Sequence, residues 1–579
     1  MSYRKKDFII VTVFVLASFL FIFPFLKWKM VFFGGDLPYH INRIQELADN
    51  LRNGNWYPYL YTYHFNKTGY LLGTFYPQLT LLPFALFSIL LGSYVKGIYL
   101  SFFIYTFIAM TIFYYVMRKL NRSQLESCLA SIIYCFCAYR SVDAFSRFAL
   151  GEFLGMVFIP LALYGLYAIL IGNKNDWPCL AIGLSFTLLS HVLSTFLCIC
   201  TLVIIFLLCL PCVNDVKIRM KKLLLSIIAF FCSSAIFLFP FFEQEMSNSY
   251  RQPSPTNLTS FTSPLSSFIL NSLSNNISSN AVPNWWDVAN IGFILIIALI
   301  WGIISYNHLD KLNRALLVLG GIFFLVSSNL FPWSIIMHTP LRIIQFPFRL
   351  LEISTIFLVP VAAKLCTVII NGTKTKWGRY LTGLLIITVI VFPWYSSIQA
   401  FIGSSLGNSE NFANSKEYTN PKNKTYWWLD QYTPVMSKQH FNAIYNHKVT
   451  VGNNNYQLKK IKAIPNGLIY NDSKLRNQQN VTLPVADYTN IQVYQNGKRI
   501  QPIRKKDNLI NLRTTSSGPI SVLYVPSLGD KISQLVSLLT WIFLLCALVK
   551  VKCKQSITIR IENKWKGVSR GFLRFTPFL

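Results

Sequence analysis

The feature that most constrains this chain is a series of apolar stretches that recurs from the N-terminus to near the C-terminus. Each stretch approaches the ~20 residues that a helix needs to cross a bilayer. Only 13% of the 579 residues are charged, compared with about 25% in soluble domains. A soluble enzyme, a fibrous chain and a disordered chain are therefore excluded, and the sequence predicts many helices that cross a membrane.

The formal net charge of +31 would suggest nucleic-acid binding in a soluble protein. Here the basic residues gather in short loops between apolar stretches, which is the pattern that orients membrane helices with their positive loops in the cytoplasm. Arg4, Lys5 and Lys6 precede the run from Phe8 to Leu26. This run is too long for a secretion signal, so we expect a retained first helix with a cytoplasmic N-terminus.

Loop charges indicate twelve crossings with both termini in the cytoplasm. This count requires that residues 76–91, a short run containing Pro77 and Pro83, enter the membrane without crossing it. The predicted crossings are 8–26, 97–117, 128–138, 150–171, 179–192, 193–210, 223–242, 289–306, 315–330, 350–370, 380–401 and 532–551.

This assignment divides the chain into a transmembrane domain (1–401, with a first outer loop at 27–75), an outer domain (402–531), a last membrane helix (532–551) and a basic cytoplasmic tail (552–579). Residues 252–280, rich in Ser, Asn, Thr and Pro, suggest a long flexible outer loop. The outer domain alternates apolar and polar residues, and Asn496-Gly497 is typical of a type I′ hairpin turn. We expect it to be mostly β-structure.

The first outer loop holds the most informative motif, Gly34-Gly35-Asp36-Leu37-Pro38. Pro38 favours a helix start. The helix that follows has an apolar face and a polar face, which predicts that it lies in the membrane interface. Asp36 then stands at its N-terminus, either as a helix cap or as a functional carboxylate. His40 and Arg43 lie on the polar face.

Four further groups are expected on the same outer side as Asp36. Arg147 and Glu152 form either a structural ion pair or part of a site, and His191 is either a packing residue or a ligand-binding one. Arg342, Gln345 and Arg349 suit phosphate, whether of a substrate or of lipid head groups. Trp285-Trp286 and Tyr426–Trp428 offer rings for sugar stacking or for an interfacial belt.

Several of these passages together resemble the bacterial membrane proteins described as 6-pyruvoyl-tetrahydropterin synthase-related and the YfhO-like proteins, within the GT-C glycosyltransferase superfamily. The resemblance covers nearly the whole chain. It rests on Gly35–His40 with Arg43, Gly69-Tyr70 with Phe75–Pro77, Tyr139–Phe153, Ser190-His191, Gln345–Arg349, Val493–Lys498 and Tyr524–Pro526.

The resemblance implies an all-α polytopic GT-C-like fold of about 12 to 13 membrane helices with a small extracellular β domain. It implies transfer of a sugar, with inversion, from a polyprenyl-phosphate carrier to a cell-envelope glycan at the outer face of the plasma membrane. Asp36 would be the catalytic base. The substrate-binding residues would be His40, Arg43, Arg147, Glu152, His191, Arg342, Gln345 and Arg349.

Two questions stay open at this level. Many members of the superfamily have two acids in the first loop, whereas here Gly34 and Gly35 precede Asp36. This departure weighs against a divalent metal, a cofactor that no clear motif supports. The 12 cysteines, all in or beside apolar stretches, favour packing. The alternatives to an enzyme are an envelope-lipid transporter, flippase or scaffold of the same fold, or a binding module working through the outer domain.

Overall fold

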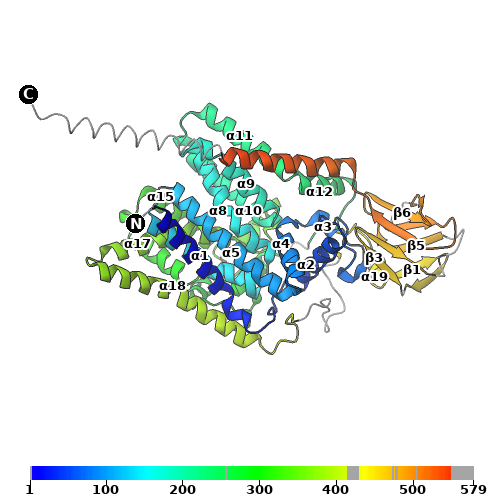
Figure 1. Ribbon diagram of the computed structural model, residues 1–579, viewed down its shortest axis with the longest axis horizontal. Helices are drawn as coiled ribbons and strands as arrows, with labels where there is room; N and C mark the ends of the chain where they lie inside the picture. The colour runs from blue at the N-terminus through cyan, green and yellow to red at the C-terminus, as the bar shows by residue number, and fades with distance from the viewer. Residues whose placement is uncertain are drawn as a thin grey trace, which may run out of the picture.

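The computed structural model describes residues 3–253, 257–413, 430–458, 460–472, 475, 480–503 and 505–549. A helical body makes up most of the molecule, and the strands gather at one end of its long axis, beyond α2 and α3 (Figure 1). The α-helices are α1 (Tyr3–Leu26), α2 (Leu37–Arg52), α3 (Leu72–Phe75), α4 (Leu82–Leu90), α5 (Tyr94–Lys119), α6 (Gln124–Phe136), α7 (Ala138–Ser141), α8 (Leu150–Leu170), α9 (Pro178–Leu188), α10 (Val192–Cys209), α11 (Val216–Ser233), α12 (Ala235–Ser247), α13 (Leu265–Leu273), α14 (Phe293–Ile304), α15 (Lys311–Val326), α16 (Trp333–Ile336), α17 (Leu350–Gly372), α18 (Lys376–Ser405), α19 (Lys438–Tyr445) and a last helix at Leu528–Val549.

Among the described residues, seven helices are long and apolar enough to cross a membrane, or nine if each of two bent pairs counts as one span. One bent pair joins Gln124–Phe136 to Ala138–Ser146, and the other joins Val216–Ser233 to Ala235–Ser247. These helices confirm the polytopic prediction. The number of twelve crossings stays a prediction, because α9 and α14 are shorter than a bilayer is thick.

The packing of α1 against α5 bears on the run at 76–91, which is predicted to enter the membrane without crossing it. Phe25 at the end of α1 stacks on Tyr99 near the start of α5, and Phe14 contacts Tyr114 near the end of α5. The two helices are therefore antiparallel neighbours. The segment between α1 and α5 therefore begins and ends on one face of the helical body, and the apolar helix within it, Leu79–Leu90, is short.

Four basic loops predicted to share the cytoplasmic side do lie together. Arg122 pairs with Asp310 at 2.8 Å, and Lys119 pairs with Asp176 at 3.0 Å. Lys174 in turn pairs with Asp215 at 3.0 Å. These contacts place the loops on a common end of the helical body, and the cytoplasmic location of that end stays a prediction.

The small β domain near the C-terminus is a two-sheet sandwich. One sheet has the order β2 (Asn454–Gln457), β1 (Lys448–Val451), β5 (Asn480–Ala486), β8 (Leu509–Arg513). The other has the order β3 (Ile461–Ile464), β4 (Gly467–Tyr470), β9 (Ile520–Tyr524), β6 (Ile491–Gln495), β7 (Lys498–Ile500). All pairs are antiparallel. Side chains such as Val449, Leu468, Val481 and Val522 fill the space between the sheets.

The predicted hairpin turn is confirmed. Gln495 and Lys498 pair across it, and both Asn496 (φ 48°) and Gly497 (φ 78°) have the positive φ that a type I′ turn requires.

Two sequence predictions are wrong. Residues 252–280 are not simply a flexible loop, because α13 forms within them and buries Phe268. Helix α2 does not present its polar face to water at an interface: His40, Arg43 and Glu46 are as buried as its apolar side chains. The first outer loop folds back over this face, which is described below.

The β domain docks on that same loop. The Asn466 side chain accepts hydrogen bonds from the backbone N–H groups of Tyr59 and Leu60, and the Tyr59 ring stacks on Tyr524 at 4.9 Å. The first outer loop is therefore held between the helices and the sheets.

Candidate functional site

Asp36 occupies the N-cap position of α2 without acting as its cap. Pro38 begins the helix as predicted, yet the Asp36 carboxylate accepts no hydrogen bond from the first turn. Asp36 as a whole residue is exposed, while Leu37 and Pro38 beside it are buried. The interpretation of Asp36 as a helix cap is therefore wrong, and its carboxylate is left accessible for another role.

The loop that carries Asp36 is anchored to the segment before α8. The Asp36 N–H donates to the carbonyl oxygen of Arg147 at 2.8 Å. A Cβ at Gly34 would lie 2.8 Å from the Phe148 Cβ and 2.9 Å from the Phe145 carbonyl oxygen. Only glycine permits this approach. A Cβ at Gly35 would meet nothing closer than 3.8 Å.

Arg147 joins two buried carboxylates. Its Nη1 lies 2.6 Å from Asp143 Oδ1 and 3.0 Å from Glu152 Oε2. Asp143 belongs to a π-helical turn, Val142–Ser146, an element often found at functional sites. The other oxygen of Glu152 accepts a hydrogen bond from the Tyr139 hydroxyl. The ion pair predicted from the sequence thus exists as part of a larger cluster.

Arg349 completes this cluster from a distant part of the chain. Its Nε lies 3.6 Å from Glu152 Oε2, and its Nη1 donates to Gln345 Oε1 at 2.8 Å. The guanidinium groups of Arg349 and Arg147 lie over the rings of Phe346 and Phe348, each at 4.9 Å. Two arginines therefore flank one carboxylate on an aromatic support.

The charges around Asp36 act in opposite directions. The protein around Asp36 displaces part of the water near its carboxylate, which raises the pKa of Asp36, and the positive charges of Arg147 and Arg349 oppose that rise. The net result is a pKa above the usual value for aspartate. A carboxylate with a raised pKa is a better proton acceptor when ionised.

The predicted histidines are both buried near this cluster. Burial and the Arg43 charge lower the pKa of His40, so its ring is neutral at physiological pH. His191 caps α10 by accepting the Ser194 N–H at 3.2 Å, so its packing role is real, while its ring lies 6.1 Å from that of Tyr76.

Arg43 links α2 to the segment around Tyr76. Its guanidinium lies over the Tyr76 ring at 4.1 Å and donates to the Pro77 carbonyl oxygen. The His40 ring lies edge-on to the Tyr76 ring at 6.3 Å, so this contact belongs to the same buried face of α2.

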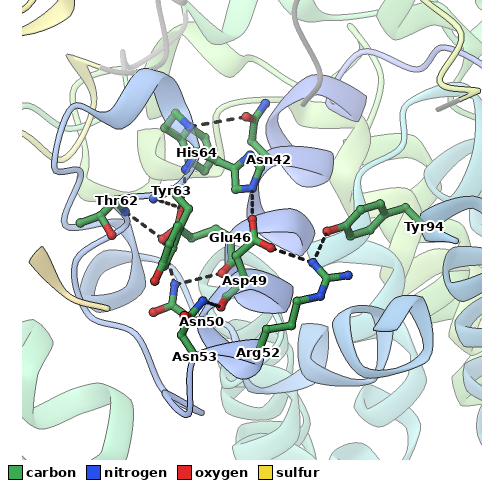
Figure 2. A network of polar contacts seen from close by, with 11 residues as sticks. Asn42, Glu46, Asp49, Asn50, Arg52, Asn53, Thr62, Tyr63, His64 and Tyr94 are labelled. Atoms are coloured by element: carbon green, nitrogen blue, oxygen red, sulfur yellow. Dashed lines mark hydrogen bonds and ion pairs between the residues drawn. The ribbon is translucent and has the colours of Figure 1, made fainter. Parts of the chain in front are cut away.

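Glu46 clamps the first outer loop onto α2 (Figure 2). Its Oε1 accepts the N–H of Thr62 at 2.8 Å, and its Oε2 accepts those of Tyr63 at 2.9 Å and His64 at 2.7 Å. Asn50 Nδ2 adds a bond of 2.9 Å. Burial raises the pKa of Glu46, against the opposing effects of His64 and these donors. Glu46 thus explains why the polar face of α2 is buried.

Other predicted residues lie apart. Arg342 is exposed, and among the described residues no side-chain hydrogen bond or ion pair joins it to the cluster; its carbonyl oxygen accepts the Gln345 N–H at 3.2 Å. Trp285 packs edge-on against Phe346 at 5.2 Å, next to the arginines. Tyr426–Trp428 lie outside the described residues.

Three acidic or phenolic groups of the cluster were not predicted as site residues: Tyr139, Asp143 and Glu352. Glu352 accepts a hydrogen bond from Ser194 at 3.1 Å. An acid inside an apolar helix is the sequence signal that would have found it. Among the described residues, no group of three or more His, Cys, Asp or Glu is placed to hold a metal ion.

Comparisons with known proteins give distant matches only. No protein-family model matches the chain, and no curated protein matches it. Similar solved structures include the arabinofuranosyltransferase AftD from Mycobacteria (14% identity, TM-score 0.46, 72% of this chain and 28% of that one). A second is the oligosaccharyltransferase AglB from Archaeoglobus fulgidus, in complex with an inhibitory peptide and a dolichol-phosphate. It has 16% identity and a TM-score of 0.39, and the match covers 76% of this chain and 58% of that one. A third is ArnT from Cupriavidus metallidurans, bound to undecaprenyl phosphate. It has 8% identity and a TM-score of 0.31, and the match covers 65% of this chain and 82% of that one.

The chain thus spans 28% of the length of AftD and 58% of the length of AglB.

Proposed function

We propose that the protein is a membrane glycosyltransferase that transfers a sugar from a polyprenyl-phosphate carrier to a cell-envelope glycan at the outer membrane face. The observation that carries this proposal is the arrangement at Asp36. Asp36 is accessible, and its carboxylate does not cap α2. Its backbone N–H donates to the carbonyl oxygen of Arg147, and the guanidinium groups of Arg147 and Arg349 both lie close to Glu152.

The chemistry of such a transfer needs a base and a cationic pocket. Asp36 accepts the proton of the acceptor hydroxyl as its oxygen attacks the anomeric carbon from the side opposite the phosphate. The bond from that carbon to the phosphate oxygen breaks, and the polyprenyl phosphate leaves with the electron pair. Arg147 and Arg349 stabilise the charge that develops on the phosphate. Inversion follows from this single displacement.

The remaining residues orient the partners. Gln345 holds the Arg349 guanidinium, and Glu152 holds both arginines in place. His40, Arg43 and His191 line the side toward Tyr76, where they provide donors and acceptors for sugar hydroxyls. The resemblance to the YfhO-like and pterin synthase-related membrane proteins belongs to this proposal and adds no pterin chemistry.

The test compares Asp36→Asn with the parent chain in membranes supplied with radiolabelled undecaprenyl-phosphate monosaccharides. We expect the variant to lose label transfer to endogenous glycan by roughly 10²-fold or more, the usual contribution of a general base. Glu245→Gln, a carboxylate in α12 that accepts from Gln252 at 2.9 Å, serves as the control and should retain activity. Equal membrane insertion is checked by labelling. Full activity of Asp36→Asn would remove the mechanism.

An envelope-lipid transporter or flippase is the second candidate. Buried ionisable groups inside membrane segments, here Arg140 beside the rings of Tyr134 and Phe153, are common along transport pathways. Uptake of labelled undecaprenyl phosphate into sealed vesicles, without any sugar transfer, would favour this function.

A further inference from the structure

One row of side chains crosses the whole outer face of the five-stranded sheet. The strand register aligns its members in the order Lys462, Ile469, Ser521, Tyr494 and Arg499. The adjacent row contains Leu468, Val522 and Val493, which are buried between the sheets. Because successive side chains of a strand point to opposite faces, the first row points away from the core.

The β domain around this row is strongly basic. Residues 438–531 contain 14 Lys and Arg against four Asp and no Glu. Every basic side chain described there is exposed, and none of the four Asp is. The exposed cations are Lys438, Lys448, Lys460, Lys462, Lys498, Arg499, Lys505, Lys506, Arg513 and Lys531.

Two of the four acids are used inside the fold. Asp507 accepts bonds from Asn511 and the Leu509 N–H, and Asp530 accepts bonds from Tyr524 and the Ser527 N–H. Within the described part of the chain, no ion pair joins any of the ten exposed cations to an acid. Their charge is therefore available to a partner.

The dimensions of the row suit an extended polymer. Lys462 and Arg499 lie on the two edge strands, four strand spacings apart, which is about 19 Å at ~4.8 Å per spacing. Tyr494 lies between them, and its hydroxyl donates to Gln492 Oε1 at 2.7 Å. Gln492 points to the same face and accepts this bond, and the Ser521 hydroxyl lies on that face in the neighbouring strand, opposite Tyr494.

We propose that this row binds an acidic glycan, with anionic groups paired to Lys462 and Arg499 and a sugar ring stacked on Tyr494. A lipid surface requires cations alone, whereas the central ring and hydroxyl add the stacking and hydrogen-bonding groups that suit sugars. This site is separate from the Asp36 cluster, so it does not depend on the proposed function.

The probe is a fluorescent hexasaccharide of galacturonic acid, with maltohexaose as its neutral counterpart, titrated against the full chain in detergent at fixed salt. The Lys462→Glu/Arg499→Glu double variant should weaken acidic-probe binding by roughly tenfold or more, because two exposed ion pairs are lost and reversed. In a separate variant, Tyr494→Ala should also weaken binding of the acidic probe relative to the parent chain, without a change of charge.

The matched control is Lys448→Glu/Arg513→Glu. Both residues are exposed on the outer face of the other sheet, so the net charge changes equally. We expect at most about a twofold loss for this control. Equal losses in the two double variants would show diffuse attraction, and equal binding of maltohexaose would show that charge is irrelevant. Stronger binding to phosphatidylglycerol vesicles than to the hexasaccharide would assign the face to lipid. Each result would overturn the proposal.

Discussion

The backbone N–H of Asp36 donates a hydrogen bond to the carbonyl oxygen of Arg147 at 2.8 Å. This bond couples the start of α2 to the turn before α8, two segments more than 100 residues apart in sequence. It holds the backbone of Asp36 against the backbone of Arg147. In the proposed mechanism this bond would help to position the base relative to the cation, and small displacements of such groups reduce rates strongly.

Gly34→Ala tests this coupling. The added Cβ would collide with the Phe148 Cβ and the Phe145 carbonyl oxygen, neither of which can move freely. We expect the loop to shift and sugar transfer to fall by roughly 10²-fold, as small displacements of catalytic groups do. Gly35→Ala is the matched control, since its Cβ meets only the Arg147 carbonyl oxygen at 3.8 Å. Similar activities for the two variants would show that the close approach is dispensable.

Local pattern accounts for what the sequence predicted well. The long apolar helices and the Asn496-Gly497 hairpin depend on neighbours along the chain, and both are confirmed. For the cluster around Arg147, the sequence predicted only that its residues share one side of the membrane. Its pairing depends on distant segments: Arg349 reaches Glu152 across almost 200 residues of sequence.

The sequence could not separate Arg342 from Arg349. Both stand in one short basic and aromatic motif. A 3₁₀ turn at Pro340–Ile344 and a positive φ of 63° at Gln345 redirect the chain between them, so Arg349 is buried in the cluster and Arg342 is exposed. Likewise, the helical periodicity of α2 predicts that Glu46 lies on a face exposed to water. The residues that cover this face, Thr62–His64, come later in the chain, so the sequence of α2 alone does not indicate that Glu46 is buried.

The pH dependence of transfer should report the raised pKa of Asp36. A base works only when ionised, so activity should fall as the pH drops through a value above that of an ordinary aspartate. Arg349→Gln removes one of the charges that lower this pKa, which moves the acid limb to higher pH. Arg513→Gln, on the outer face of the β domain, removes the same charge far away and should leave the limb in place. An acid limb unchanged by Arg349→Gln would separate Asp36 from the observed titration.

Glu46 should contribute strongly to stability and only indirectly to catalysis. Glu46→Ala leaves the buried N–H groups of Thr62, Tyr63 and His64 without their acceptor, and each unpaired group costs about 1–3 kcal/mol. We expect unfolding of the detergent-solubilised chain to require about 3 kcal/mol less free energy. Glu46→Gln keeps an acceptor oxygen and should lose less than the alanine variant. If both variants unfold like the parent chain, water replaces the carboxylate readily, and the first outer loop is held instead by its contacts with Asn466 and Tyr524.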